Sequence, residues 1–214
     1  MITTIYLIRH SNTFKEHKGK TITNEPLLIQ NEKEPLSILG ENNASNFFEN
    51  EEFRNIDFVW SSNYVRAMST AKYMAHYNNT VVNIDESFNE RVHGVNSYGD
   101  LPMDFEKIQF NNKEYKIGYG ESQKEVSLRM QKGINRLLDE YKGKRIAVIS
   151  HGTAIMYYLS LYCKTSYLDN CYFKDKLFFD GNLNYLETFK LEFNERNELI
   201  NITNIKMENK DEKL

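Results

Sequence analysis

The sequence predicts an α/β fold: a three-layer α/β/α sandwich with a mostly parallel central sheet and helices on both faces. Short apolar runs rich in β-branched and aromatic residues are typical of buried strands, and three are present: TIYLI (4–8), DFVWSS (57–62) and RIAVIS (145–150). Helical patterns separate them, and strands that alternate with helices favour a parallel sheet covered on both sides. The 214 residues suit one domain. We expect it to span 1–206, with MENKDEKL (207–214) as a polar tail.

Four helices are expected between and after these strands. The clearest begins with a capping box, in which Ser122 and Glu125 bond each other's free backbone amides, and it ends before Gly143. Behind this cap, apolar residues recur at helical spacing and predict one buried face. The other three helices begin at Ser37, after SSN (61–63) and after SHG (150–152).

The remaining segments predict an edge and a lid. YLETFKLEFNERNELINITNIKM (185–207) alternates around the turn-like NERN, which predicts a hairpin of two strands or an antiparallel edge on the sheet. Residues 92–120 show no dominant period. A long irregular segment inside a compact domain is more often functional than a simple connector, so we expect a lid or substrate segment there.

Composition excludes two classes of partner. A net charge of −3 and a pI near 6.0 leave no basic stripe for nucleic acid. No basic region precedes the N-terminal apolar run, and no stretch approaches the ~20 apolar residues of a membrane span. We therefore expect a cytoplasmic protein that acts on neither nucleic acid nor membranes. The sequence leaves its oligomeric state open.

Polar residues follow each predicted strand. In open α/β sheets the ligand crevice lies off the carboxyl ends of the strands. Arg9 and His10 follow the first strand, and His151 and Gly152 follow the third. Arg66 lies in the first turn of the helix after the second strand, where free amides favour an anion. If these strands are parallel neighbours, two histidines and two arginines share one pocket.

This set of side chains suits a phosphate group. Guanidinium groups bind phosphate oxygens bidentately, and the same cations would repel a metal ion, so we expect no metal. A neutral nitrogen of His10 could attack the phosphorus and form a phosphohistidine, provided that the other ring nitrogen meets an acceptor, such as a backbone carbonyl. His151 would then donate to the phosphoryl oxygens and stabilise the developing charge.

The leaving oxygen of an ester needs a proton. Glu90 in FNERVHG is the candidate donor, provided that its surroundings keep it protonated near neutrality. After transfer it would act as the base for water. Glu86 and Glu121 are alternatives for this role, and Arg91 could simply pair with Glu90.

At these residues the sequence resembles the histidine phosphatase superfamily, also called phosphoglycerate mutase-like. The resemblance covers nearly the whole chain, in the expected order. The matching segments are LIRHSNT (7–13), PLSILGENNA (35–44), SSNYVRAMSTA (61–71), NERVHG (89–94), GES (120–122) and VISHGTAI (148–155). They are similar to the family's L-x-R-H-G-x-T, P-L-[ST]-x-x-G-x-x-Q-A, S-S-P-x-x-R-A-x-Q-T-A, N-E-R/x-x-G, helix-entry and V-x-H-G segments.

The resemblance implies a phosphate pocket of Arg9, His10, Arg66 and His151, phosphorylation of His10 in turnover, and Glu90 as proton donor. It implies no metal or organic cofactor for the phosphatase members.

Two positions depart from the family pattern. Ser11 replaces the usual glycine and adds a Cβ where backbone must approach phosphate closely, which could lower activity. Glu16 lies near where the family often has a phosphate-contacting asparagine, and a carboxylate there would repel phosphate unless it turns away or meets a cation. Thr13 keeps a hydroxyl that can donate to phosphate.

The sequence therefore predicts a phosphomonoesterase of the histidine acid phosphatase type, acting on a small phosphorylated metabolite through phosphohistidine at His10. One alternative is a cofactor-type phosphoglycerate mutase, which returns the phosphoryl group to a second hydroxyl. The mutases that this chain resembles tend to be longer, which favours the phosphatase. Another alternative is a non-catalytic module that binds a phosphorylated ligand, which Ser11 and Glu16 encourage.

Overall fold

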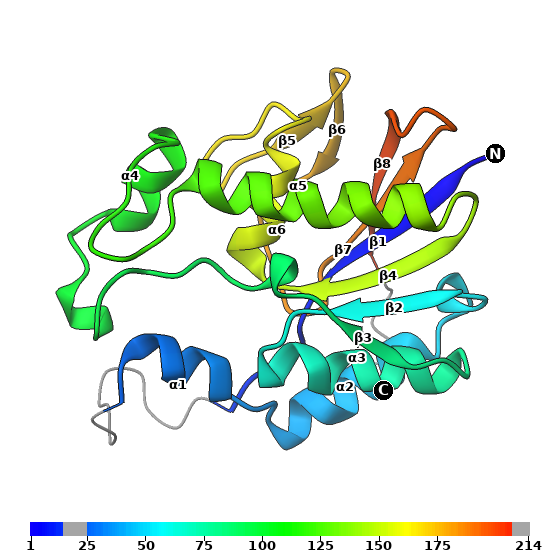
Figure 1. Cartoon of the computed structure of the whole chain (residues 1–214), viewed down its shortest axis with the longest axis horizontal. Coiled ribbons are helices and arrows are strands. Elements are labelled where there is room, and N and C mark those ends of the chain that lie inside the picture. The colour runs from blue at the N-terminus through cyan, green and yellow to red at the C-terminus, as the bar shows by residue number, and fades with distance from the viewer. Residues whose placement is uncertain (15–24, 207–214) are drawn as a thin grey trace, which may run out of the picture.

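A computed structural model describes residues 1–14 and 25–206 of the chain. Its centre is a six-stranded sheet in the order β3-β2-β4-β1-β7-β8 (Figure 1). The strands are β1 (Thr3–Arg9), β2 (Phe58–Ser61), β3 (Val82–Ile84), β4 (Arg145–Ser150), β7 (Thr188–Phe193) and β8 (Leu199–Ile205). The first four of these run parallel, whereas β7 is antiparallel to both β1 and β8. The predicted fold class and the C-terminal hairpin at the edge of the sheet are confirmed.

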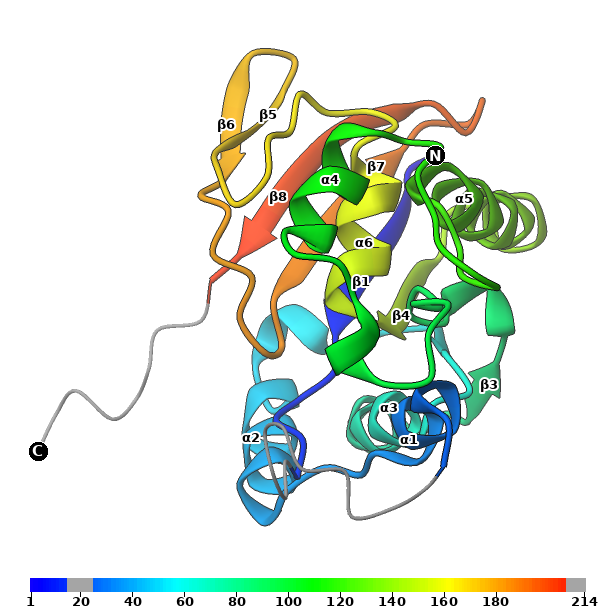
Figure 2. The ribbon, with the colours of Figure 1, turned by 90° about the vertical axis from the view of Figure 1, so that its left-hand side faces the viewer.

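Helices cover both faces of the sheet, as Figures 1 and 2 show. One face carries α5 (Gln123–Glu140) and α6 (Gly152–Leu159), and the other carries α2 (Ile38–Phe48) and α3 (Val65–Tyr77). Strand β1 alternates between them: Ile5 and Leu7 pack in the core under α5 and α6, and Tyr6 and Ile8 pack in the core under α2 and α3. Such alternation in a strand buried on both faces explains its continuous apolar sequence.

The helix starts follow the predicted caps. Ser122 Oγ accepts a hydrogen bond from the Glu125 amide and the Glu125 carboxylate accepts one from the Ser122 amide, which forms the expected capping box of α5. Ser37 Oγ accepts from the Gly40 amide at the start of α2. Each cap satisfies backbone donors that have no partner within the helix.

Several short elements were not predicted from the sequence. They are β3, α1 (Leu27–Lys33), α4 (Phe105–Asn111), β5 (Cys171–Phe173), β6 (Lys176–Phe179) and the 3₁₀ turns η1 (Glu51–Phe53), η2 (Glu86–Phe88) and η3 (Tyr98–Asp100). Elements of three to seven residues span too few turns or pleats to establish a hydrophobic period.

The segment 92–120 is more regular than expected, because it contains α4. In that helix only Phe105 and Gln109 are buried, and such a pair, one apolar and one polar, gives no apolar stripe. The segment leaves and returns at one place, since the Glu121 amide donates to the Val92 carbonyl oxygen at 2.9 Å. At this closure Gly94 has φ +83°, and an added Cβ would lie 2.0 Å from the Ile117 oxygen. The two ends of the segment 92–120 therefore lie side by side, and the segment forms the left side of the molecule in Figure 1.

Two further expectations concern the chain as a whole. The tail predicted at 207–214 lies outside the described residues. Among the residues that the structure describes, no helix is long and apolar enough to cross a membrane.

Candidate active site

The parallel pairing of β1 with β4 places both candidate histidines at one edge of the sheet. Arg9 pairs with Ser150, so His10 and His151 follow neighbouring strand ends. The two ring centroids are 5.2 Å apart, and the exposed fractions of the two residues are 6% and 0%. The sheet therefore brings the two buried imidazoles together at one edge, as the strand ends predict.

The hydrogen bonds of His10 fix its tautomer. Nδ1 lies 2.8 Å from the Ser11 carbonyl oxygen, which can only accept, so Nδ1 carries the hydrogen. Nε2 lies 3.1 Å from Nε of Arg66, which can only donate, so Nε2 presents a lone pair. The backbone carbonyl expected from the sequence is that of Ser11. Nε2 is consequently the nucleophilic atom of this side chain.

His151 is held from the opposite side by Ser62. Its Nε2 lies 2.8 Å from Ser62 Oγ, which also accepts from the Tyr64 amide, and this hydroxyl can either donate to the ring nitrogen or accept from it. Within the described part of the chain, Nδ1 of His151 is buried and has no hydrogen-bond partner. Burial, followed by the charges of Arg66 and His10, holds the pKa of His151 well below 6.5. The structure thus presents a neutral imidazole whose Nδ1 has no partner.

The two arginines come from different elements, and Arg66 contacts His10. Arg66, in the first turn of α3, is 4% exposed, and besides His10 it contacts Glu34 through Nη1 at 3.5 Å from Oε2. Arg9 ends β1 and donates from Nη1 to the Leu183 carbonyl oxygen at 2.7 Å. Its guanidinium carbon lies 4.6 Å from the centroid of the Tyr185 ring. Burial lowers the pKa of Arg9, with the charge of Arg66 adding to this and those of Tyr185 and Glu90 opposing it.

Glu90 lies at the start of α6, next to His151. Its carboxylate accepts hydrogen bonds from the backbone amides of Arg91, Thr153 and Ala154, at 2.8, 3.3 and 3.0 Å. The free amides and positive end of a helix favour an anion at this place. Glu121, an alternative from the sequence, is instead ion-paired to Arg129 at 2.7 Å. The second alternative, Glu86, accepts from the Asn63 amide side chain at its exposed position.

Arg91 does not form an ion pair with Glu90. Its guanidinium makes two 2.7 Å contacts with the carboxylate of Glu106 on α4, and it also contacts Gln109 and His93. Arg91 is 3% exposed, so this network is buried at its centre. The segment 92–120 is therefore tied to the residue next to Glu90.

The remaining predicted site residues line the same region. An added Cβ on Gly152 would lie 2.6 Å from Cδ2 of Leu183 and 3.4 Å from Nε of Arg9, so the end of the Leu183 side chain would have to shift. Thr13 forms an isolated antiparallel bridge with Leu36, which fixes its backbone beside the start of α2.

Ser11, the first departure from the family pattern, is accommodated by hydrogen bonds to neighbouring helices. Ser11 Oγ donates to the Gly40 carbonyl oxygen at 2.8 Å, and the Ser11 amide donates to Thr70 Oγ1 at 3.0 Å. The serine side chain therefore points into the contact with α2. Glu16, the second departure, lies outside the described residues.

Sequence reasoning missed four residues of this site. Ser62 belongs to the SSN segment and directly follows β2, so its place at a strand end was a usable signal. Tyr185 and Glu34 come from connections that match no motif, and Leu183 contributes a backbone oxygen, which leaves no trace in a sequence.

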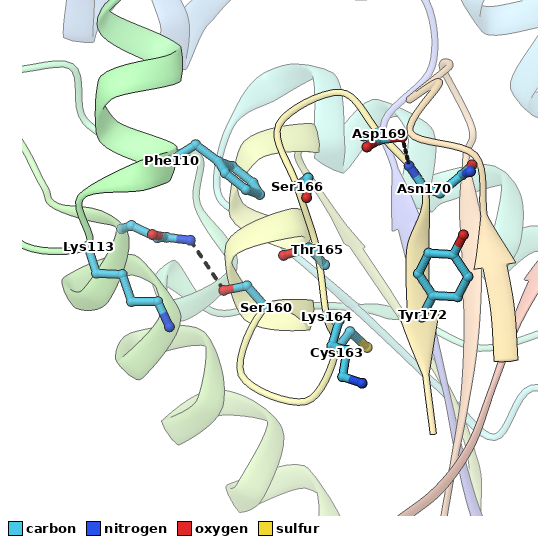
Figure 3. Close-up of a pocket in the computed structure, with 11 residues that line it drawn as sticks. Phe110, Lys113, Ser160, Cys163, Lys164, Thr165, Ser166, Asp169, Asn170 and Tyr172 are labelled. Atoms are coloured by element: carbon cyan, nitrogen blue, oxygen red, sulfur yellow. Dashed lines mark hydrogen bonds between the residues drawn. The ribbon is translucent and has the colours of Figure 1, made fainter. Parts of the chain in front are cut away.

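A separate cavity lies elsewhere in the molecule. It has a volume of about 480 Å³ and lies between the end of α4, the end of α6 and the loop that leads to β5 (Figure 3). Its wall includes Phe110, Ser160, Asn170 and Tyr172, and none of the site residues above lines it. Among the described residues, no group of three or more His, Cys, Asp or Glu side chains is arranged to hold a metal ion.

Comparison with known families identifies the superfamily of the chain. A sequence model of the histidine phosphatase superfamily (branch 1) matches residues 5–172, which include His10, Arg66, Glu90 and His151. The chain belongs to this superfamily. No curated protein sequence matches it.

Solved structures share its fold at low sequence identity. A mycobacterial glucosyl-3-phosphoglycerate phosphatase has a TM-score of 0.67 at 16% identity, covering 95% of this chain and 97% of that one. A putative α-ribazole-5'-phosphate phosphatase from Escherichia coli has a TM-score of 0.64 at 21% identity, with coverages of 95% and 96%. A phosphoserine phosphatase from Entamoeba histolytica, in complex with 3-phosphoglyceric acid, has a TM-score of 0.66 at 17% identity, with coverages of 92% and 94%.

Proposed function

We propose that this protein is a phosphomonoesterase that hydrolyses a small phosphorylated metabolite through a phosphohistidine at Nε2 of His10. In the first step Nε2 attacks phosphorus, the bond to the ester oxygen breaks, and the alcohol leaves with a proton. In the second step water attacks the phosphohistidine, the P–N bond breaks, and phosphate is released. The observation that carries the proposal is the fixed tautomer of His10, whose lone pair faces the guanidinium of Arg66.

The surrounding cations would hold the phosphoryl group. Arg66 contacts His10, and Nε of Arg9 and Nδ1 of His151 are buried and have no partner in the described part of the chain. Both arginines would donate to phosphoryl oxygens, and His151 would do so in the tautomer that carries its hydrogen on Nδ1. We assign Thr13 and the Gly152 backbone to phosphate binding as well. Attack by His10 requires Nε of Arg66 to release the Nε2 lone pair, and this N–H group can then turn to a phosphoryl oxygen.

Glu90 would move the proton in both steps. The carboxylate held by three backbone amides is the form that takes a proton from water when the phosphohistidine is hydrolysed. The first step needs the same group with its proton, which it then gives to the leaving oxygen. The three amides stabilise the carboxylate instead, so the surroundings expected from the sequence for a protonated Glu90 are not those of the substrate-free site. The reaction returns the proton with each cycle.

The test is hydrolysis of p-nitrophenyl phosphate by the wild-type protein and by His10→Ala. We expect turnover by the wild type and none by the variant. Phosphate binding without turnover by the wild type would contradict the proposal and support the non-catalytic alternative. A long-lived phosphoenzyme that 3-phosphoglycerate discharges would indicate a mutase, whereas rapid loss of phosphate to water indicates a phosphatase.

Several features of the site support a phosphatase. The Ser11 hydroxyl, which encouraged the non-catalytic reading, is bound to α2 and leaves the His10 geometry intact. The solved structures compared above carry the names of phosphatases with small phosphorylated substrates. The acid phosphatase type and the cytoplasmic location remain predictions from the sequence. We assign no metal or organic cofactor to the reaction.

A further inference from the structure

Glu34 lies at the rim of the candidate phosphate pocket. Its Oε2 is 3.5 Å from Nη1 of Arg66, and the exposed fractions of the two side chains are 26% and 5%. The same Nη1 donates to the Asn31 carbonyl oxygen. The Nε atom of the same guanidinium donates to Nε2 of His10. A carboxylate thus shares one guanidinium with the proposed nucleophile.

The backbone fixes Glu34 in this place. It ends α1 with φ −57° and ψ 116°, an extended conformation that the following Pro35 favours. The Phe14 amide donates to the Pro35 carbonyl oxygen at 3.0 Å, and Thr13 pairs with Leu36. The segment that carries Glu34 is therefore bonded to the chain that directly follows His10.

The segment 92–120 contacts the same part of the molecule. Tyr98, in the segment 92–120, donates from its hydroxyl to Asn31 Oδ1 at 3.1 Å. The pKa of Tyr98 is raised by desolvation and by the charges of Glu34 and Glu90, while the charge of Arg66 opposes them. Asn31 therefore accepts from Tyr98 at its side chain and from Arg66 at its backbone.

This arrangement has a consequence for the substrate. A phosphoryl group bound by Arg66 is brought beside the Glu34 carboxylate, and two negative groups at that distance repel each other. A cationic group on the alcohol part of the ester, a few bonds from phosphorus, would pair with Glu34 and remove the repulsion. A carboxylate at the same position would add to it.

We infer that Glu34 is a specificity-determining residue that selects phosphate esters of amino alcohols over esters that carry a carboxylate. The inference rests on the proposed function and names its substrate class. The contact that carries it is the sharing of Arg66 between Glu34 and His10.

The test compares kcat/KM for three esters of similar size: phosphoethanolamine, ethyl phosphate and phosphoglycolate. We expect the wild type to prefer them in that order, and Glu34→Gln to reduce the preference for phosphoethanolamine over phosphoglycolate at least tenfold. The matched control is Glu25→Gln, which removes the same charge next to α1 from a residue paired with Lys33. This control should keep the wild-type preference.

Two results separate the inference from the proposed function. An equal change for all three esters in Glu34→Gln would overturn the inference, because Glu34 would then only position Arg66. Absence of turnover of any ester, p-nitrophenyl phosphate included, would overturn the proposed function alone. In that event calorimetric binding of phosphoethanolamine and phosphoglycolate to the wild type and to Glu34→Gln decides the inference, which fails if the variant keeps the wild-type ratio of affinities.

Discussion

Replacement of Gly40 by alanine should disturb the catalytic loop from outside the pocket. Gly40 lies in the first turn of α2, and an added Cβ would lie 1.9 Å from the carbonyl oxygen of Asn12. Close carbon–oxygen contacts in proteins are about 3.3–3.6 Å, so one backbone must move by roughly 1.5 Å relative to the other. The chain that must yield includes Ser11, whose carbonyl oxygen holds His10 Nδ1.

The expected effect is larger on catalysis than on stability. Overpacking costs about 1–3 kcal/mol, but alanine in place of glycine within a helix regains about 1 kcal/mol. The free energy of unfolding should therefore fall by roughly 0–2 kcal/mol. Misplacement of a reacting group by about 1 Å can cost on the order of a hundredfold in rate, so kcat/KM should fall by about that factor.

Urea unfolding and hydrolysis of p-nitrophenyl phosphate measure the two effects. Gly99→Ala is the matched control, because its Cβ would meet nothing closer than Ser97 Oγ at 3.7 Å. If Gly40→Ala keeps kcat/KM within twofold of this control, the link from α2 to His10 is wrong.

Three further predictions follow from the acid and its neighbours. Glu90→Gln should slow esters with poor leaving groups more than p-nitrophenyl phosphate, which needs little protonation; equal losses of kcat/KM on both would remove Glu90 from the acid role. Arg91→Ala should lower the free energy of unfolding in urea by about 1.5–3 kcal/mol, because it leaves Glu106 and Gln109 without their buried cation. Arg54 is more exposed, and a loss no larger than that of Arg54→Ala would count against the network. Burial, with the charge of Arg91, lowers the pKa of His93 from 6.5 to about 4, so the unfolded chain binds the proton first and stability should fall as pH drops from 6.5 towards 4. His93→Gln should remove roughly 3 kcal/mol of that fall between urea titrations at the two ends of the window, and an unchanged slope would contradict the assignment.

Much of the fold could be predicted because its long elements carry their own signals. Strand β1 is apolar along its length because both faces are buried. The capping box of Ser122 and Glu125 marks the start of α5. The alternation of strands with helices predicts parallel strands, and the parallel pairing of β1 with β4 brings His10 next to His151. Local pattern and sheet geometry were therefore enough to assemble the centre of the site.

The rim of the site could not be predicted in the same way. Glu34 reaches Arg66 only because a seven-residue helix, too short for a hydrophobic period, packs beside α3. Tyr185 reaches Arg9 through a connection that crosses the strand ends, and its sequence neighbours show no regular pattern. Such contacts depend on where loops cross in space, which residue spacing does not record. Glu34, which we propose to select the substrate, is one of these residues, so specificity was the least predictable property.

The most direct test of the account is transfer of a labelled phosphoryl group to the protein. Substrate with ³²P in the ester is mixed with the wild type and with His10→Ala, and the reactions are stopped with alkali, in which phosphohistidine survives. The account predicts label on the wild-type peptide that contains His10 and none on the variant. Turnover by the wild type with the label on another residue, or with equal labelling of His10→Ala, would contradict it.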